Sequence, residues 1–249
     1  MKTILAEQEN ADIETSSEGY AQRFSGNVGR WMLKKQADIV VDLLKKCNAE
    51  ALLDVGGGHA QLTQPLIDNG YNVTVHGSAD ICRTRIQEFL DQNQCQFVCA
   101  PMFELPFSDG HFDTVICIRL LTHCNRWEEL VRELCRVAQR NIIIDYPSAK
   151  SLNALVSGKI FAFKKKLEGN TRTWRLFRKK ELQEAFAKHG FTYVREVKQY
   201  FLPMVFHRTL RCPRISSALE GICQLLGLTH LWGSPSIMLL QSNSENKHI

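Results

Sequence analysis

The chain has 249 residues, of which 44% are hydrophobic, and a formal net charge of +5. This is enough apolar material for one sizeable domain, and no apolar run approaches the roughly 18 residues of a membrane-spanning helix. Residues 1–17 are polar and acidic, which predicts a disordered tail with no secretory signal. The nine cysteines have no CxxC spacing, so we expect reduced thiols in a cytoplasmic protein and no metal site.

Helices are predicted over residues 18–50, ahead of the first strand. Apolar residues recur at helical spacing between Leu33 and Leu44. The segment before them carries Tyr20 and Arg23 among aromatic and polar residues, and we expect it to fold over a pocket. These helices would form the N-terminal cap of a single domain that spans residues 18–249.

The most informative stretch, residues 52–60, has the pattern of a short buried strand followed by a glycine turn. Asp54 precedes Gly56 and Gly58 in it, and a helical pattern opens at residue 61. In a doubly wound α/β sheet this first turn lies where nucleotides bind, and glycine lets the backbone approach a ligand. Asp54 would repel the pyrophosphate of a dinucleotide and attract the ammonium group of S-adenosylmethionine. The turn therefore favours S-adenosylmethionine over a nicotinamide cofactor, with a purely structural glycine turn as the alternative.

Strands and helices alternate after this turn, which predicts a mostly parallel sheet with helices on both faces. Two stretches interrupt the alternation: residues 148–176 carry an apolar stripe at helical spacing, and residues 199–234 are rich in bulky apolar residues. Both are predicted to be helical insertions that cap the sheet. Strands are expected at residues 73–75, 96–99, 112–118, 141–146, 191–197 and 236–240, and helices at residues 81–90, 127–137, 181–189 and 215–226.

Positive charge is concentrated in residues 150–214, which hold sixteen Lys or Arg and four Glu. Such a segment favours an anionic partner, which could be an acidic substrate, a membrane surface or RNA, although a solvated helix face explains the charge equally well. Lys164, Lys165 and Lys166 adjoin the apolar stripe, so one hypothesis places this segment on an anionic membrane surface.

Three motifs resemble those of the class I S-adenosylmethionine-dependent methyltransferases, and within them the type 11 group that contains small-molecule and quinone methyltransferases. The first is the acidic glycine turn at residues 54–60. The second, residues 104–115, leads into the fourth strand, and the third, residues 121–138, contains Leu-Thr-His and the helix after it. Their order and spacing fit together from about residue 20 to residue 146.

The resemblance implies a seven-stranded sheet with a reversed last hairpin and a Rossmann-like arrangement. It further implies a methyltransferase whose cofactor, S-adenosylmethionine, lies over the ends of the first four strands. The methionine part of the cofactor would be held by Asp54, Gly56 and Gly58.

Two positions depart from the family pattern. Gly77 stands where an acid usually binds the ribose, and Pro101 stands where an Asp often binds the adenine. A lost bond to a carboxylate typically costs about 1.5–3 kcal/mol. We expect Ser78 to take over part of the ribose contact and Met102 to contact the adenine.

Candidate catalytic residues come from loops at the strand ends. His123 has a pKa suited to a general base near neutral pH. Arg119 ends the fourth strand and could bind an anionic group of the acceptor, and Tyr146 ends the fifth strand and could orient the acceptor. We expect Tyr20 and Arg23 to close over the cofactor.

The acceptor is expected to be a small, hydrophobic or aromatic molecule, because apolar insertions can line a lipophilic pocket. Two other functions stay open. One is a catalytically silent binding or scaffold protein with this fold, which Gly77 and Pro101 support. The other is an RNA methyltransferase, although the chain has no recognisable RNA module, and nucleic acid is not the expected partner.

Overall fold

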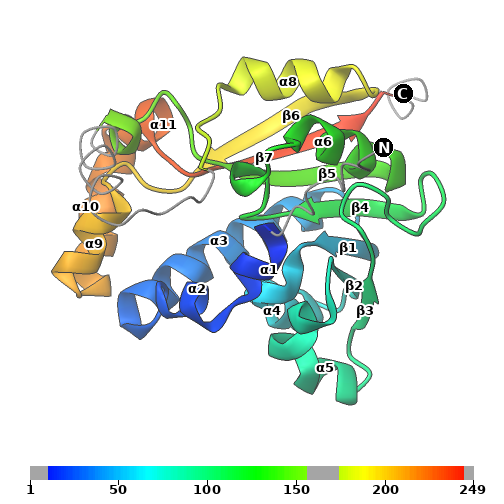
Figure 1. Ribbon diagram of the computed structural model, residues 1–249. Coiled ribbons are helices and arrows are strands. Elements are labelled where there is room, and N and C mark those ends of the chain that lie inside the picture. The colour runs from blue at the N-terminus through cyan, green and yellow to red at the C-terminus, as the bar shows by residue number, and fades with distance from the viewer. Residues whose placement is uncertain (1–10, 156–173, 244–249) are drawn as a thin grey trace, which may run out of the picture.

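A seven-stranded sheet forms the centre of the computed structural model, which describes residues 11–155 and 174–243 (Figure 1). The strand order is β3-β2-β1-β4-β5-β7-β6, and β7 runs antiparallel to both of its neighbours while the other pairs are parallel. This confirms the predicted fold class, a doubly wound and mostly parallel sheet. The strands are β1 Ala51–Val55, β2 Asn72–Gly77, β3 Gln96–Cys99, β4 Phe112–Cys117, β5 Ala138–Tyr146, β6 Phe191–Lys198 and β7 Ser236–Ser242.

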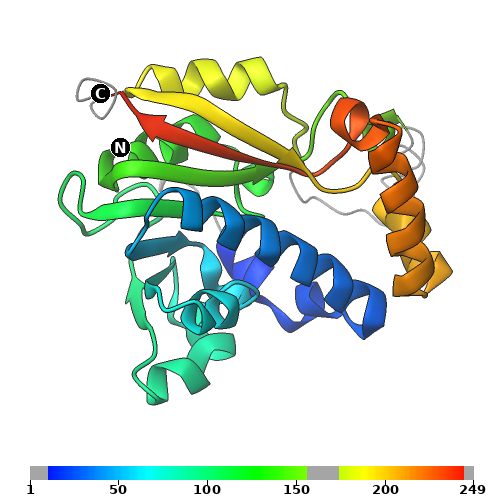
Figure 2. The ribbon, with the colours of Figure 1, turned by 180° about the vertical axis from the view of Figure 1, so that it is seen from behind.

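Helices cover both faces of the sheet (Figures 1 and 2). The α-helices are α1 Ala11–Ser16, α2 Glu18–Gln22, α3 Gly26–Lys46, α4 Thr63–Asp68, α5 Gln87–Asp91, α6 Trp127–Val137, α8 Lys179–Ala187, α9 Met204–Leu210, α10 Pro213–Leu225 and α11 Leu228–Trp232. The short 3-10 helices are η1 Gly57–His59, η2 Asp80–Ile86 and η3 Leu121–His123.

Two apolar cores, one on each face, hold these layers together. On one face α6 and α8 pack on the sheet, and Leu134 and Phe186 are fully buried there. On the other face α3 and α4 bury Leu44 and Leu66. The strand β4 is buried along its whole length, as expected for a central parallel strand with helices on both sides. Each fully buried Leu or Phe side chain stabilises the folded state by about 1.5–3 kcal/mol, because its apolar surface is removed from water.

Most predicted elements are present within a few residues of their expected bounds. The helix predicted over residues 81–90 begins as the 3-10 helix η2 and becomes α-helical only at α5. The tail predicted to be disordered needs a correction, because residues 11–16 form α1 and four of them are buried. Most of the apolar stripe of the first insertion, together with Lys164, Lys165 and Lys166, falls on residues 156–173, outside the described residues. Of its described residues, Leu152 is half-buried and Leu155 is exposed.

Three helices, α9 to α11, stand at one end of the sheet beside the carboxyl end of β5 (Figure 2). They occupy the second predicted insertion. No helix among the described residues is long and apolar enough to cross a membrane.

Candidate functional site

The glycine turn after β1 is shaped around a buried carboxylate. A Cβ on Gly57 would lie 2.2 Å from Asp54 Oδ2, so a side chain at this position would collide with the carboxylate. Gly56 has a φ of +73°, and a Cβ there would lie 2.8 Å from a methyl group of Leu120. Both positions therefore require glycine, one to make room for the acid and one to turn the chain.

Asp54 itself has no hydrogen-bond partner. Its side chain is fully buried, and neither Oδ1 nor Oδ2 is satisfied by any described group. Burial raises the pKa of Asp54 to about 7. A buried carboxylate without a partner is costly, and natural proteins keep such a group where a ligand completes it.

The helix α1 lies over this turn and over the end of β2. Asp12, fully buried, accepts hydrogen bonds from the backbone N–H of Ser78 at 2.5 Å and from its hydroxyl at 2.6 Å. Ser16 is equally close to the turn, since a Cβ on Gly58 would lie 2.5 Å from Ser16 Oγ. Two of the expected cofactor contacts, Gly58 and Ser78, are thus covered by α1.

Two further contacts fix the segment around α1. Glu18, at the start of α2, forms an ion pair of 2.6 Å with Arg85 of η2. Ala11 belongs to the same buried cluster as Met102, the residue expected near the adenine. The N-terminal segment is therefore held against η2 and the end of β2, where the sequence predicts part of the cofactor site.

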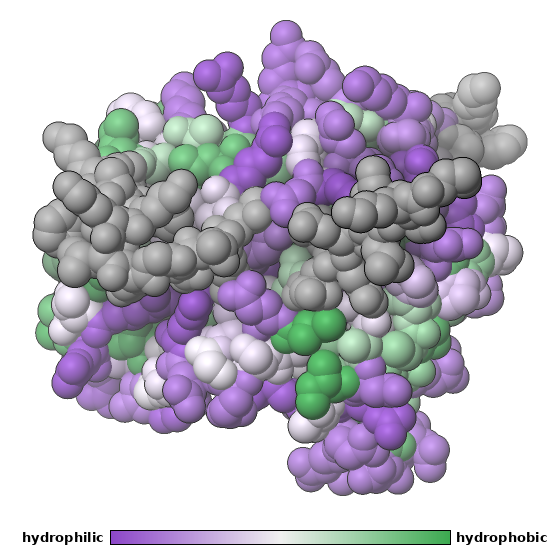
Figure 3. Space-filling model, viewed as in Figure 1, coloured by the Kyte–Doolittle hydropathy of each residue, from purple (hydrophilic) through white to green (hydrophobic). Residues whose placement is uncertain are grey.

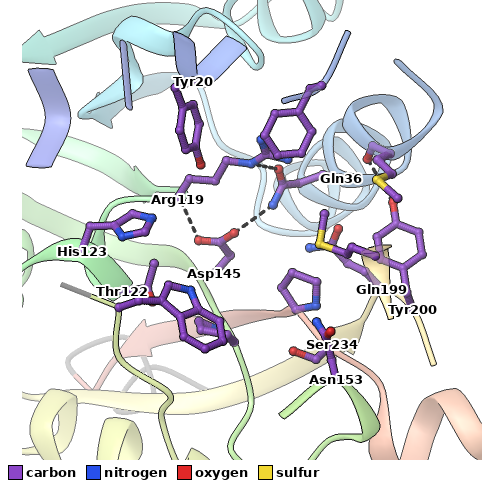
Figure 4. Close-up of a pocket in the computed structure, with 16 residues that line it drawn as sticks. Tyr20, Gln36, Arg119, Thr122, His123, Asp145, Asn153, Gln199, Tyr200 and Ser234 are labelled. Atoms are coloured by element: carbon purple, nitrogen blue, oxygen red, sulfur yellow. Dashed lines mark hydrogen bonds between the residues drawn. The ribbon is translucent and has the colours of Figure 1, made fainter. Parts of the chain in front are cut away.

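A hydrogen-bonded network lies next to the turn, where β4 and β5 end (Figure 4). The backbone N–H of Arg119 donates to Asp145 Oδ1 at 2.6 Å, and Arg119 Nε donates to Gln36 Oε1 at 2.9 Å. Gln36 Nε2 closes the triangle by donating to Asp145 Oδ2 at 2.9 Å. Burial raises the pKa of Asp145, and the bond and charge of Arg119 oppose that rise.

Arg119 adopts a backbone conformation that is rare for a side chain of its size. Its φ is +62°, in the left-handed region, and its guanidinium carbon lies 3.8 Å from the centre of the Phe24 ring. Strain of this kind persists where the surroundings over-determine it, often at functional sites. Here the bond to Asp145 holds the backbone, and Gln36 and Phe24 hold the side chain.

The network borders a cavity of about 140 Å³. Tyr20, Phe24 and Arg119 line both this cavity and a second one of about 350 Å³ beside the glycine turn, so they form the wall between the two. The first cavity is mostly apolar and aromatic in its lining, and it includes Tyr20, Phe24, Met32, His123, Pro147, Trp174, Tyr200, Met204 and Pro235.

The structure brings some predicted catalytic residues together and not others. His123, in η3, and Arg119 both line the first cavity, as does Tyr20. Tyr146 points into the apolar core instead, where its hydroxyl donates to Glu196 Oε1 at 2.5 Å. Arg23 is exposed and packs against the Tyr20 ring, 5.5 Å from its centre.

Two residues central to the site have no counterpart among the candidates from sequence. Gln36 is a buried polar residue in the apolar face of α3, and that break in the stripe is the signal that points to it. Asp12 lies in a polar segment with no pattern, and only the folded chain brings it to Ser78, 66 residues away.

Comparison with known proteins identifies the central part of the chain. Residues 53–143 match the family model described as "Methyltransferase domain". This segment is therefore similar in sequence to a methyltransferase domain. The match begins inside β1 and ends inside β5, so it contains the glycine turn, the end of β4 and η3.

An uncharacterised protein of Methanocaldococcus jannaschii is 28% identical to the chain over 111 residues. That match covers 44% of this chain and 43% of the relative, so the chain spans less than half the length of the curated relative it matches.

Solved structures extend the likeness to almost the whole chain. Magnesium protoporphyrin IX methyltransferase from Synechocystis, solved with bound SAH, is 18% identical, covers 93% of this chain and 97% of its own, and has a TM-score of 0.66. A sarcosine dimethylglycine methyltransferase assigned in Galdieria sulphuraria is 12% identical over 84% of this chain and 86% of its own, with a TM-score of 0.60. The chain therefore has the class I, Rossmann-like fold that these S-adenosylmethionine-dependent methyltransferases share, as its strand order indicates.

Proposed function

We propose that the protein transfers a methyl group from S-adenosylmethionine to a small, apolar or aromatic acceptor. The observation that carries this proposal is the carboxylate of Asp54, fully buried at the glycine turn and without a partner. The ammonium group of the cofactor's methionine part is a cation of suitable size to pair with it, and such a charge-assisted bond is about twice as strong as a neutral one.

The remaining cofactor contacts would come from the turn and from the end of β2. The backbone at Gly56 and Gly58 has no Cβ in the way, and Ser78 offers an N–H and a hydroxyl there. When bound, S-adenosylmethionine supplies an activated methyl group on its sulfonium. Arg23 is exposed and lies against the Tyr20 ring, so a contact between Arg23 and the cofactor also requires this segment to move.

The helix α1 stands where the cofactor would lie, so the proposal requires α1 to move. Asp12 holds both donors of Ser78, and Ser16 fills the space above Gly58. Only six residues form α1, and a helix of this length has little stability of its own. The free energy needed to displace α1 therefore comes mainly from the loss of its tertiary contacts.

The acceptor would occupy the cavity lined by His123 and Arg119. Aromatic rings line it, which favours a flat or apolar molecule, and the Arg119 guanidinium offers a cation to an acidic or phenolic group. His123 can accept a proton from the acceptor if the reaction requires it. The cavity of about 140 Å³ is smaller than the 300–1,000 Å³ typical of ligand pockets, so acceptor binding also requires the cap to open.

The proposal is tested by calorimetry and thermal unfolding of the full chain with S-adenosylmethionine. We expect binding heat and a raised midpoint of unfolding. A screen of metabolite extracts with labelled methyl donor then searches for the acceptor. In that screen we expect His123→Gln to lower the rate of labelling, while the control His111→Gln, at an exposed site beside Phe107, leaves it unchanged.

A catalytically silent protein with this fold is the second candidate. Its support is the occupation of the expected ribose site by Asp12 and the presence of Gly77 where the family usually has an acid. This candidate predicts no binding heat and no thermal shift with S-adenosylmethionine, even for a variant in which α1 is loosened by Asp12→Ala.

A further inference from the structure

The helix α10 is oriented with its polar side inward. Ser216 and Glu220, its two buried residues, are both polar and are 0% and 2% exposed. Three of its four large apolar residues, Ile215, Ile222 and Leu225, face solvent instead, and Leu225, at 89%, is the most exposed of them, while Leu219 is half-buried. An amphipathic helix in a globular protein normally buries its apolar stripe, so the orientation of α10 is the reverse of the usual one.

Specific bonds fix this orientation. Glu220 accepts hydrogen bonds from the backbone N–H groups of Phe201 and Leu202, both at 2.9 Å. It also lies 2.9 Å from Nε2 of His207, which is fully buried. These three contacts attach the polar side of α10 to the rest of the cap, and a buried carboxylate with such partners is costly to remove. The apolar side is therefore held outward by the fold.

The outward residues form a stripe that runs along α10 to the residue after its end. Ile215, Ile222 and Leu226 follow one another at spacings of seven and four, which places them on one side of the helix, and Leu226 stands directly after its last residue. Their exposed fractions are 50%, 54% and 67%. Trp232, on the neighbouring α11, is 41% exposed. Figure 3 shows hydrophobic surface at this end of the molecule, over α11.

The charges around the stripe are positive. Residues 203–232 contain three Arg and one acidic residue, and that acidic residue is the buried Glu220. Arg211 and Arg214, just before and within the first turn of α10, are exposed. An anionic surface would therefore meet two cations and no exposed carboxylate in this segment.

We propose that α10 and α11 dock this protein on the surface of a lipid bilayer that contains anionic lipids. A short helix with an apolar stripe, basic residues at its end and an aromatic side chain beside it is suited to lie in the plane of a membrane interface. The stripe is too small to explain a stable dimer. A 13-residue helix is about 20 Å long and about 10 Å wide, which gives a footprint of about 200 Å², whereas stable partners bury about 800 Å² each.

This docking surface differs from the basic segment that the sequence suggested. Its apolar part comes from α10 and α11, which follow most of the basic residues of the segment 150–214 in the sequence. Met204, at the start of α9, lines the cavity with His123, so a bilayer at this end would bring lipid-soluble molecules close to it. That consequence rests on the proposed function, whereas binding to the bilayer does not.

The test is sedimentation of the full chain with vesicles made of equal parts phosphatidylglycerol and phosphatidylcholine, and with vesicles of phosphatidylcholine alone. We expect binding to the anionic vesicles that weakens as salt is raised. The double variant Leu225→Ser/Leu226→Ser should lower the partition constant at least tenfold, since each buried Leu contributes about 1.5–3 kcal/mol. Arg214→Glu should lower it several-fold.

Ile81→Ser is the matched control, because Ile81 is 61% exposed on η2 and should not contribute. All variants change exposed residues, so their unfolding midpoints should equal that of the parent. We also expect them to bind S-adenosylmethionine as the parent does, so a loss of vesicle binding can be told apart from a failure of the proposed function. The proposal is overturned if the parent binds neither vesicle, or if the double variant and Ile81→Ser bind alike. It is also overturned if the parent is a dimer that the double variant dissociates and neither binds vesicles, because the stripe then joins two copies of the chain.

Discussion

Asp12 and Ser78 lie 66 residues apart in the sequence, and the carboxylate of Asp12 accepts both the backbone N–H and the hydroxyl of Ser78. The carboxylate thereby occupies the end of β2, where this chain has Gly77 in place of the acid expected from its resemblance to the methyltransferases. The pair explains how a chain can keep the fold of the S-adenosylmethionine-dependent enzymes and yet have its expected ribose site covered.

We expect Asp12→Ala to tighten S-adenosylmethionine binding about tenfold. The substitution removes charge-assisted hydrogen bonds, worth about 1.5–3 kcal/mol, that hold α1 over the site, so a larger fraction of molecules can bind. Calorimetry measures the affinity, and the unfolding midpoint without ligand should fall. Asp38→Ala, which removes an exposed acid on α3 that pairs with Lys34, is the control for net charge. Weaker binding by Asp12→Ala would instead make Asp12 a ligand of the cofactor.

The affinity for S-adenosylmethionine should rise with pH up to about 7. Burial raises the pKa of Asp54 to about 7, so below this pH the acid must lose a proton before it can pair with the ammonium. Above pH 8 the affinity should level off or fall, because an α-amino group has a pKa of about 7.7–8.0. In titration calorimetry at several pH values, the affinity of Asp54→Asn should not increase with pH. This variant should bind S-adenosylmethionine about 10- to 100-fold more weakly than the parent. A pH-independent affinity of the parent contradicts the proposed contact.

The same carboxyl group should make the ligand-free protein less stable as pH rises. The folded-state pKa of Asp54 lies above the ordinary aspartate value of 3.8, so the contribution of Asp54 to stability is fully present below about pH 4 and is lost as pH rises through about 7. Chemical denaturation of the parent and of Asp54→Asn gives the difference between their free energies of unfolding. Between pH 4 and 7 the free energy of unfolding of Asp54→Asn should rise relative to that of the parent. An unchanged difference would show that Asp54 is ionised and paired in the ligand-free protein.

The variant Gln36→Met should lower stability by about 1–3 kcal/mol. Met has a similar length but cannot donate to Asp145 or accept from Arg119 and Gln61, so the buried carboxylate of Asp145 and two half-buried donors each lose a partner. Thermal unfolding measures the change. Gln64→Met is the control, since Gln64 is exposed and its side chain donates to Asp68 one turn away. Equal midpoints for the two variants would mean that the network does not contribute to folding.

The fold was predictable from sequence because its signals are local and repeated. The helix α6 was placed at its observed bounds by the spacing of Leu130, Val131 and Leu134, and β3 by its short apolar run. The glycine turn was predictable because glycine and a nearby acid form a short motif. The tail at residues 11–16 was misassigned because polar composition alone does not show that Asp12 finds two donors in another part of the chain.

The sequence by itself determined the order of strands and helices, the position of the glycine turn and the presence of His123 and Arg119 near the strand ends, since these follow from periodicity and from short motifs. Only the tertiary structure decided that α1 covers the turn, that Gln36 joins Arg119 to Asp145, that Tyr146 faces the core and that α10 turns its apolar side outward. These features depend on contacts between residues far apart in the chain, whose hydrogen-bonding groups and charges find their partners only when the sheet brings them together.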